Sequence, residues 1–307
     1  MRAFYPKRIQ IEVTNRCNLD CSMCPRSQFD LDEKDIDLNI FGLILEKLRP
    51  GSEIILTGWG EPLLHPDIFQ MISLCKKRGC SASLTTNGTL LSEDNSFRLI
   101  ESGIDSVAIS VDTFSRIPDS DMRHRFLSIK DNIRNLILAK GKSRKPKIIL
   151  QPTLHKGKEE DVIGIIKESK LLGVDKINIA RLDRRFNINL LFYQDSEELA
   201  VARRINKLSS QLKIKVDMVP FLKSGFFRGI FLLGIFKRIC RLIRSCPKVY
   251  DYLYITVEGK VTPCCGIPRY IVGDLLLSSV KEIWNGRLMK EFEDKQTDIC
   301  QGCQIYT

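Results

Sequence analysis

The chain has 307 residues, of which 43% are hydrophobic, so it can bury one large core or two smaller ones. Its 48 Lys and Arg outnumber its 37 Asp and Glu, and a formal charge of +11 favours anionic partners such as nucleic acid, a membrane surface or a phosphorylated substrate. No signal peptide precedes the first predicted strand, which argues against a secreted disulfide scaffold. The 11 cysteines are therefore expected to be reduced thiols of a cytoplasmic protein, available to bind metal.

Between about residue 8 and residue 181, apolar β-branched runs alternate with segments of helical period. This alternation predicts repeated βα units around a parallel sheet. The predicted strands cover residues 9–13, 53–57, 81–85, 106–111, 147–152 and 176–180. The predicted helices cover residues 38–48, 66–78, 92–102, 128–140 and 159–172. Six strands are too few for a closed eight-stranded barrel.

Three cysteines follow the first predicted strand with the spacing CxxxCxxC: Cys17, Cys21 and Cys24. Three thiolates on one short loop can hold three corners of a cubane iron–sulfur cluster, whose full ligation takes four. One iron would then be open to a substrate or cosubstrate, as in catalytic metal sites. A structural zinc site is the alternative, but its next candidate ligand, His65, lies on a different predicted βα loop.

This loop, with Pro25 after it, resembles the cluster loop of the radical S-adenosylmethionine (SAM) superfamily. GWGEP, residues 58–62, resembles the superfamily's segment that receives the amino group of SAM, with Trp59 where a glycine is usual. The resemblance implies an α/β fold with a partial (β/α)6 TIM-like barrel, and a [4Fe–4S] cluster and SAM as cofactors. The SAM-binding residues that it implies are Gly58, Trp59, Gly60, Glu61, Pro62, Asn87, Ser110, Asp112 and Arg123, with Arg125 as the alternative to Arg123.

Five further cysteines flank a predicted hairpin whose turn is at Glu258 and Gly259: Cys246, Cys264, Cys265, Cys300 and Cys303. Four thiolates suit a closed cluster, and a zinc ribbon is the alternative by spacing. With Gly273, Asp274 and KEIWNG at residues 281–286, the segment resembles a small cysteine-rich auxiliary-cluster domain of the twitch or SPASM type. The resemblance implies one auxiliary [4Fe–4S] cluster, with Cys246, Cys264, Cys300 and Cys303 as metal ligands. Cys265 could replace Cys264, or could be a catalytic hydrogen donor.

The predicted domains are a radical SAM core at 1–185, a linker or substrate-covering helical segment at 186–245 and the auxiliary-cluster domain at 246–307. Residues 221–244 are apolar with a basic end, and their longest uncharged run is too short to span a bilayer. Lys237, Arg241 and Arg244 would share one helical face. An interfacial helix with peripheral membrane contact is therefore one alternative, and a packing helix between domains is the other.

The resemblance implies a radical SAM oxidoreductase that reductively cleaves SAM to a 5′-deoxyadenosyl radical and abstracts hydrogen from a small molecule, a sugar or a lipid headgroup. An external donor such as flavodoxin or ferredoxin would supply the electron. The auxiliary cluster would support net oxidation, whereas a nearby thiol would allow epimerisation. Peptide modification is an alternative, weakened because only about eight residues precede the first strand, too few for a leader-binding domain. A zinc-containing nucleic-acid-binding protein is the alternative of another class, but the interleaved aromatic and basic pattern of such proteins is missing from the sequence.

Overall fold

The computed structural model describes residues 5–29, 31–114, 123–183, 185–186, 193, 195–218, 246, 251–301 and 303, without the side chains of 123–128, 195 and 297. The chain divides into two compact units. The first contains residues 1–86, 101–105 and 243–307, and the second contains residues 87–100 and 106–242.

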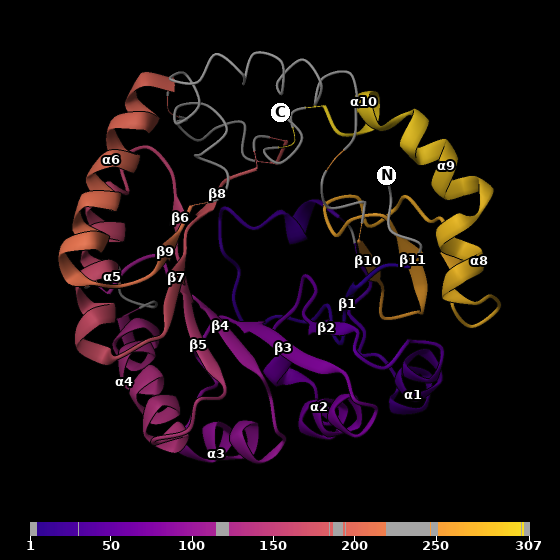
Figure 1. The fold of residues 1–307 in the computed structure, drawn as a ribbon, viewed down its shortest axis with the longest axis horizontal. Helices are drawn as coiled ribbons and strands as arrows, with labels where there is room; N and C mark the ends of the chain where they lie inside the picture. The colour runs from indigo at the N-terminus through magenta and orange to yellow at the C-terminus, as the bar shows by residue number, and fades with distance from the viewer. Residues whose placement is uncertain are drawn as a thin grey trace. The chain divides into compact units, whose positions relative to one another are not determined.

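Three parallel strands form the centre of the first unit: β1 (Arg8–Ile11), β2 (Glu53–Leu56) and β3 (Ser81–Thr86). Two helices, α1 (Leu38–Glu46) and α2 (Ile68–Lys77), connect them and lie on the same side of the strands (Figure 1). The helix α1 begins where Asp37 caps it, because the Asp37 carboxylate accepts hydrogen bonds from the first free backbone N–H groups. These strands and helices are the ones that the sequence predicts.

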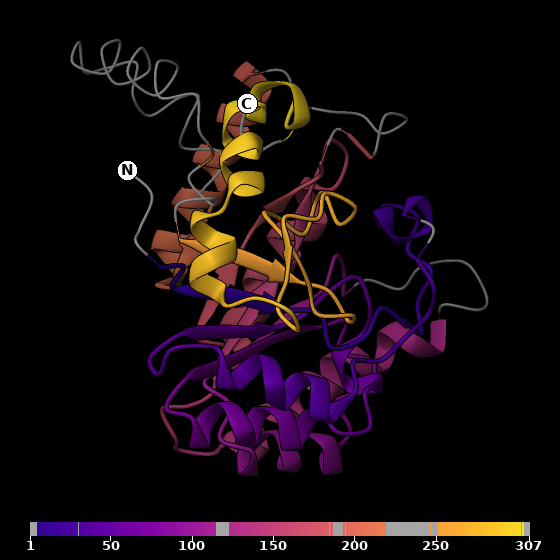
Figure 2. The ribbon, with the colours of Figure 1, turned by 90° about the vertical axis from the view of Figure 1, so that its right-hand side faces the viewer.

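The C-terminal hairpin extends the same sheet. Its first strand, β10 (Tyr252–Ile255), pairs in parallel with β1, and β11 (Lys260–Thr262) and β12 (Gly273–Asp274) follow antiparallel. The predicted turn is present, and Gly259 adopts φ 77°, a left-handed conformation that suits glycine. The helices α8 (Val280–Asn285), α9 (Arg287–Asp294) and α10 (Gln296–Ile299) follow in the chain, and they lead from the side of the hairpin toward the C-terminus (Figure 2).

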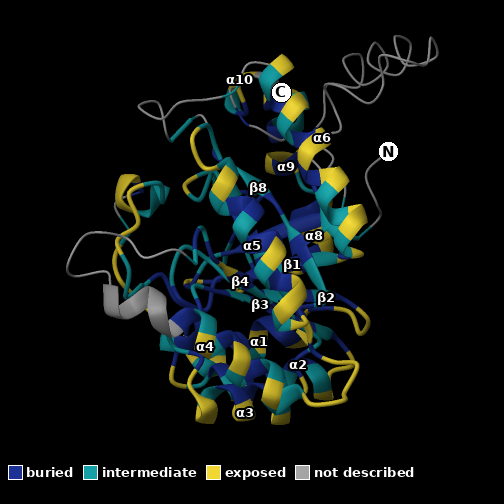
Figure 3. Cartoon of the chain, turned by 90° about the vertical axis from the view of Figure 1, so that its left-hand side faces the viewer, coloured by how far each residue is buried: buried dark blue, intermediate teal, exposed yellow. Residues whose placement is uncertain are grey.

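The second unit has its own parallel strands, in the order β4 (Ser106–Ser110), β5 (Lys147–Gln151), β7 (Lys176–Asn178) and β9 (Val216–Asp217). A separate short pair joins β6 (Thr153–Leu154) to β8 (Ala180–Arg181). The helices of this unit are α3 (Glu93–Glu101), α4 (Arg123–Lys140), α5 (Glu159–Leu172) and α6 (Asp195–Leu212). Exposed positions gather on the helices and loops, and the strand residues are almost all buried or intermediate (Figure 3).

The sequence did not predict β6 or β9, which are only two residues long and carry no periodic pattern. The predicted strand 176–180 is observed as β7 and the start of β8. The segment 221–244, with Lys237, Arg241 and Arg244, lies outside the described residues. Within the described part of the chain, no helix is both long enough and apolar enough to cross a membrane. The division into domains at 185 and 245 stays a prediction.

Candidate functional site

The three N-terminal cysteines lie on one loop of the first unit. Cys17 and Cys24 are half-buried and Cys21 is exposed. The backbone N–H of Cys24 donates to the carbonyl of Cys21 at 2.9 Å, and the 3-10 helix η1 (Pro25–Gln28) begins immediately afterwards. Burial raises the pKa of the Cys17 thiol, and the Arg26 charge partly opposes this. A bound cation would favour the thiolates that these positions need as ligands.

No disulfide joins the ten cysteines that the structure describes. Among the described side chains, no group of three or more His, Cys, Asp or Glu is close enough together to hold one metal ion.

Asn15 closes the base of the cysteine loop. Its Nδ2 donates to the carbonyl of Asp32 at 2.6 Å, and its Oδ1 accepts from the backbone N–H of Lys34 at 2.6 Å. Its own backbone N–H donates to the carbonyl of Lys34 at 3.1 Å. The buried amide therefore holds the two ends of the loop together. Sequence reasoning missed Asn15, because nothing local marks which asparagine spans a loop.

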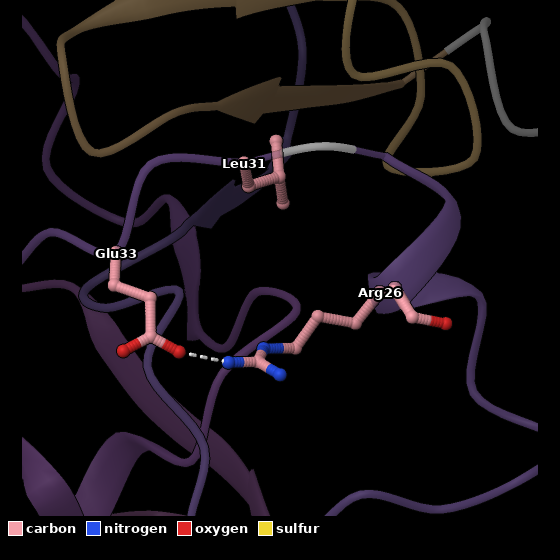
Figure 4. A pocket seen from close by; sticks show the side chains of 4 residues that line it. Arg26, Leu31 and Glu33 are labelled. Atoms are coloured by element: carbon pink, nitrogen blue, oxygen red, sulfur yellow. Dashed lines mark hydrogen bonds and ion pairs between the residues drawn. The ribbon is translucent and has the colours of Figure 1, made fainter.

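Arg26 follows the same loop in the chain, two residues after Cys24. Its Nε donates to the carbonyl of Asn15 at 3.0 Å, and its guanidinium forms an ion pair with Glu33 (Figure 4). Together with Ser27 and Leu31, these two side chains line a pocket of about 150 Å³. The ion pair holds the Arg26 guanidinium near the cysteine loop, where its charge acts to lower the pKa of the Cys17 thiol.

The two glycines of GWGEP are required by close backbone approach. A Cβ at Gly58 would be 2.5 Å from Oε1 of Glu12, and a Cβ at Gly60 would be 2.5 Å from the carbonyl oxygen of Thr14. Because Gly58 has no side chain, the Glu12 carboxylate can lie against it, and its Oε1 accepts from the backbone N–H of Trp59 at 2.9 Å. The segment is thus packed directly against the backbone that leads into the cysteine loop.

Glu61 and Pro62 end this segment and start the short helix η2 (Pro62–Leu64). The Glu61 carboxylate is buried, and its Oε1 accepts from the backbone N–H of Leu63 at 3.1 Å and from the hydroxyl of Thr86 at 2.7 Å. Its backbone N–H donates to the carbonyl of Arg16 at 2.8 Å. Glu61 therefore fixes the strand ends around the predicted SAM-binding segment.

Trp59, the departure from the usual glycine, joins this segment to the C-terminal cysteines. Its indole Nε1 donates to the carbonyl of Cys265 at 3.1 Å, and its ring packs on Phe29, with ring centroids 4.7 Å apart. One side chain thus connects the two cysteine-bearing parts of the first unit. The indole N–H supplies a hydrogen bond that glycine could not make.

The C-terminal cysteines are mostly buried. Cys246, Cys300 and Cys303 are 8%, 8% and 7% exposed, and Cys264 and Cys265 are half-buried. The sulfur of Cys264 accepts from the backbone N–H of Gly266 at 3.4 Å. Buried thiols alone would be a small apolar core, but the N–H directed at the Cys264 sulfur would also stabilise a thiolate at that position. The donor set fits an iron–sulfur cluster.

The remaining predicted SAM contacts lie in the second unit. Asn87 Oδ1 accepts from the backbone N–H of Thr89 at 2.9 Å, Ser110 is exposed at the end of β4, and Asp112 Oδ1 accepts from the backbone N–H of Thr153 at 2.8 Å. Burial raises the pKa of Asp112, opposed in part by these hydrogen bonds from Thr153. The side chain of Arg123, and that of its alternative Arg125, lies outside the described residues. Contact of these residues with SAM stays a prediction.

His65, the fourth ligand of the zinc interpretation, is fully engaged by backbone. Its Nδ1 accepts from the N–H of Asp67 at 3.0 Å, which leaves Nε2 protonated to donate to the carbonyl of Ile36 at 2.9 Å. Neither nitrogen has a lone pair for a metal. His65 is therefore a structural residue of the core.

Two family models match the chain. The radical SAM superfamily model matches residues 11–171, which is more than half of the chain, and the SPASM model, an iron–sulfur cluster-binding domain, matches residues 246–304. AdoMet-dependent heme synthase of Methanosarcina barkeri is 22% identical over 97% of this chain and 91% of that protein. The tungsten-containing aldehyde ferredoxin oxidoreductase cofactor-modifying protein of Pyrococcus furiosus is 39% identical, but the match spans 34% of this chain and only 31% of that protein.

Solved structures share the fold. SuiB of Streptococcus suis bound to S-adenosylmethionine superposes with a TM-score of 0.74 at 14% identity, over 98% of this chain and 71% of that one. The structure of anSMEcpe with bound AdoMet gives a TM-score of 0.68 at 14% identity, over 98% and 84% of the two chains. The expected α/β fold of partial-barrel type, with a C-terminal cluster domain, is thereby confirmed.

The two family matches coincide with the two cysteine groups. At both groups they support iron–sulfur clusters in place of the zinc interpretation. The cofactors are accordingly a SAM-binding [4Fe–4S] cluster, SAM itself and auxiliary iron–sulfur ligation in the C-terminal domain. With three cysteines on its N-terminal loop and a buried cysteine set after its hairpin, this chain belongs to the radical SAM superfamily and carries a SPASM domain.

Proposed function

We propose that this chain is a radical SAM oxidoreductase with one auxiliary [4Fe–4S] cluster, acting on a small molecule, a sugar or a lipid headgroup. When bound, the N-terminal cluster supplies the electron that cleaves SAM to a 5′-deoxyadenosyl radical. Cys17, Cys21 and Cys24 would hold that cluster, and the segment from Gly58 to Pro62, with Asn87, Ser110, Asp112 and Arg123, would hold SAM. Flavodoxin or ferredoxin would deliver the electron.

The burial of the C-terminal cysteine set is the observation that carries this proposal. Cys246, Cys300 and Cys303 are each less than a tenth exposed, and Cys264 supplies a fourth sulfur that already accepts an N–H. A closed four-thiolate site leaves no iron open for substrate, so the cluster held there would transfer electrons. An electron acceptor beside a substrate radical favours net two-electron oxidation.

The surroundings of Cys265 favour oxidation over epimerisation. The Cys265 thiol lies beside the hydroxyl of Tyr252, which is buried and donates to Oε1 of Gln10 at 2.6 Å. Burial, followed by the neighbouring Cys265 and Cys264, raises the pKa of Tyr252. A thiol that faces a buried tyrosine is poorly placed to return a hydrogen atom to a substrate. Cys264 is therefore the preferred ligand and Cys265 the supporting residue.

Small-molecule chemistry is supported by the names of relatives, which include a heme synthase and GTP 3′,8-cyclases of archaea and bacteria. Peptide modification stays the second candidate, because the structures with the same fold include SuiB bound to its precursor peptide SuiA.

Incubation of the reconstituted protein with each substrate class, with formation of 5′-deoxyadenosine as the readout, separates the two candidates. Consumption of SAM stimulated by peptides alone would contradict the small-molecule proposal.

Iron and sulfide quantitation with electron paramagnetic resonance (EPR) tests the cofactor assignment. We expect about eight irons per chain in wild type and about four in the Cys17→Ala, Cys21→Ala, Cys24→Ala variant, from the four irons of each cluster. Zinc without iron would refute the assignment.

Two serine variants test the ligand choice. In the triple-alanine background, Cys264→Ser should reduce the remaining iron and alter its EPR spectrum, because serine replaces a soft thiolate. Cys265→Ser is the matched control and should retain the iron. The reverse result would make Cys265 the ligand.

A further inference from the structure

The side chain of Gln296 lies wholly buried at the start of α10, four residues before Cys300. Its Oε1 accepts from the backbone N–H of Cys246 at 2.9 Å, and its backbone carbonyl accepts from the N–H of Cys300 at 2.9 Å. A single residue therefore contacts two of the proposed ligands of the auxiliary cluster. No sequence motif marks it.

The amide nitrogen of Gln296 lacks an acceptor. Nε2 is buried, and no hydrogen-bond partner for it lies in the part of the chain that the structure describes. The orientation of the amide is fixed, because the backbone N–H of Cys246 can only donate and must face the oxygen. A buried donor without an acceptor costs free energy, so native proteins seldom retain one unless another group satisfies it.

None of the described cysteine sulfurs accepts from Nε2. The same amide group accepts the hydrogen bond from Cys246 through its oxygen, and Cys246, Cys300 and Cys303 are all buried. The acceptor that this location offers is therefore a sulfide of the cluster that these cysteines would hold. Thiolates and cluster sulfides both accept N–H hydrogen bonds, and these bonds help to set the reduction potential.

We propose that Nε2 of Gln296 donates a hydrogen bond to a sulfide of the auxiliary cluster, and thereby stabilises the reduced cluster. The inference rests on the proposed ligand set of Cys246, Cys264, Cys300 and Cys303.

The expected effect has a definite sign. Reduction adds negative charge to the cluster, and an N–H directed at its sulfur stabilises that charge. Without the donor, the ratio of reduced to oxidised cluster at a fixed potential should fall roughly tenfold. For a one-electron couple, a tenfold change corresponds to about 59 mV toward more negative potential.

An EPR-monitored redox titration of the full-length protein measures this shift. The Cys17→Ala, Cys21→Ala, Cys24→Ala background leaves only the auxiliary cluster signal. Gln296→Leu removes both hydrogen bonds of the amide, whereas Gln296→Glu keeps an acceptor for the Cys246 N–H and removes only the donor. Gln301→Glu is the control for charge, since Gln301 is exposed and adjacent to Cys300.

Both Gln296 variants should titrate at more negative potential than wild type, and Gln296→Glu should shift further than Gln301→Glu. In deuterated solvent, the hyperfine signal of an exchangeable deuteron on the reduced cluster should weaken in Gln296→Leu.

A Gln296→Leu variant that binds its iron and has the wild-type potential would overturn the proposal. A second pair of results would also overturn it: Gln296→Leu loses iron, and Gln296→Glu has the same potential as the Gln301→Glu control. Gln296 would then only hold the backbone N–H of Cys246 in place. Absence of iron from the background protein itself would overturn the ligand set as well, and iron content distinguishes that failure from the others.

Discussion

Replacing Gly60 by alanine should displace the backbone that leads into the N-terminal cysteine loop. The new Cβ would be 2.5 Å from the carbonyl oxygen of Thr14 and 2.8 Å from the carbonyl carbon of Asn15, with the carbonyl of Arg16 closer still. All three obstacles are backbone atoms that cannot rotate away. An ordinary contact needs about 3.5 Å, so the chain from Thr14 to Arg16 must move by about 1 Å.

The cost follows from what this movement disturbs. Overpacking in a close-packed region costs about 1–3 kcal/mol. The Arg16 carbonyl also accepts from the Glu61 N–H at 2.8 Å, and loss of that hydrogen bond adds about 1 kcal/mol. We therefore expect the free energy of unfolding to fall by about 3 kcal/mol.

Anaerobic urea denaturation of the apo protein, followed by circular dichroism, measures this loss. Gly42→Ala is the matched control, because Gly42 lies inside α1 and a Cβ added there would meet no atom of a neighbouring segment within 4 Å. Alanine at that position should raise the free energy of unfolding by up to about 1 kcal/mol. Reconstituted Gly60→Ala should also bind fewer than the wild-type number of irons. A wild-type denaturation midpoint together with full iron loading would refute the reasoning.

Two further substitutions, one in each unit, test single contacts. Burial tends to raise the pKa of Asp175, but the N–H of Ile148 and the ammonium of Lys140 outweigh it and lower the pKa. Asp175→Asn should therefore cost about 1–2 kcal/mol near pH 7, and the difference from wild type should disappear as the pH falls through the lowered pKa, because this stabilisation requires the carboxylate. Urea midpoints across the acid range measure it, and a pH-independent difference would contradict the role of the charge. Trp59→Phe loses the indole hydrogen bond to the Cys265 carbonyl and should cost about 1 kcal/mol. It should speed iron release to a chelator without changing the iron initially bound, and a release rate equal to that of wild type would count against the link.

Local patterns in the sequence were sufficient for much of the fold. The six predicted strands and five predicted helices correspond to observed elements, because alternation and helical period depend on residues only a few positions apart. The CxxxCxxC spacing likewise predicted one shared loop for Cys17, Cys21 and Cys24, because these cysteines lie only a few positions apart. The turn at Gly259 was equally local, because its left-handed φ is a property of one residue.

Contacts between distant segments were decided only by the tertiary structure. The sequence predicts the hairpin that contains β10, but the parallel pairing of β10 with β1 depends on two segments more than two hundred residues apart. The same holds for Asn15 across the cysteine loop, for Trp59 at the Cys265 carbonyl and for Gln296 at the Cys246 amide. An asparagine, a tryptophan or a glutamine can find hydrogen-bond partners almost anywhere. Which partner it finds is fixed by the packing of the whole chain, because only the folded core excludes water as the competing partner.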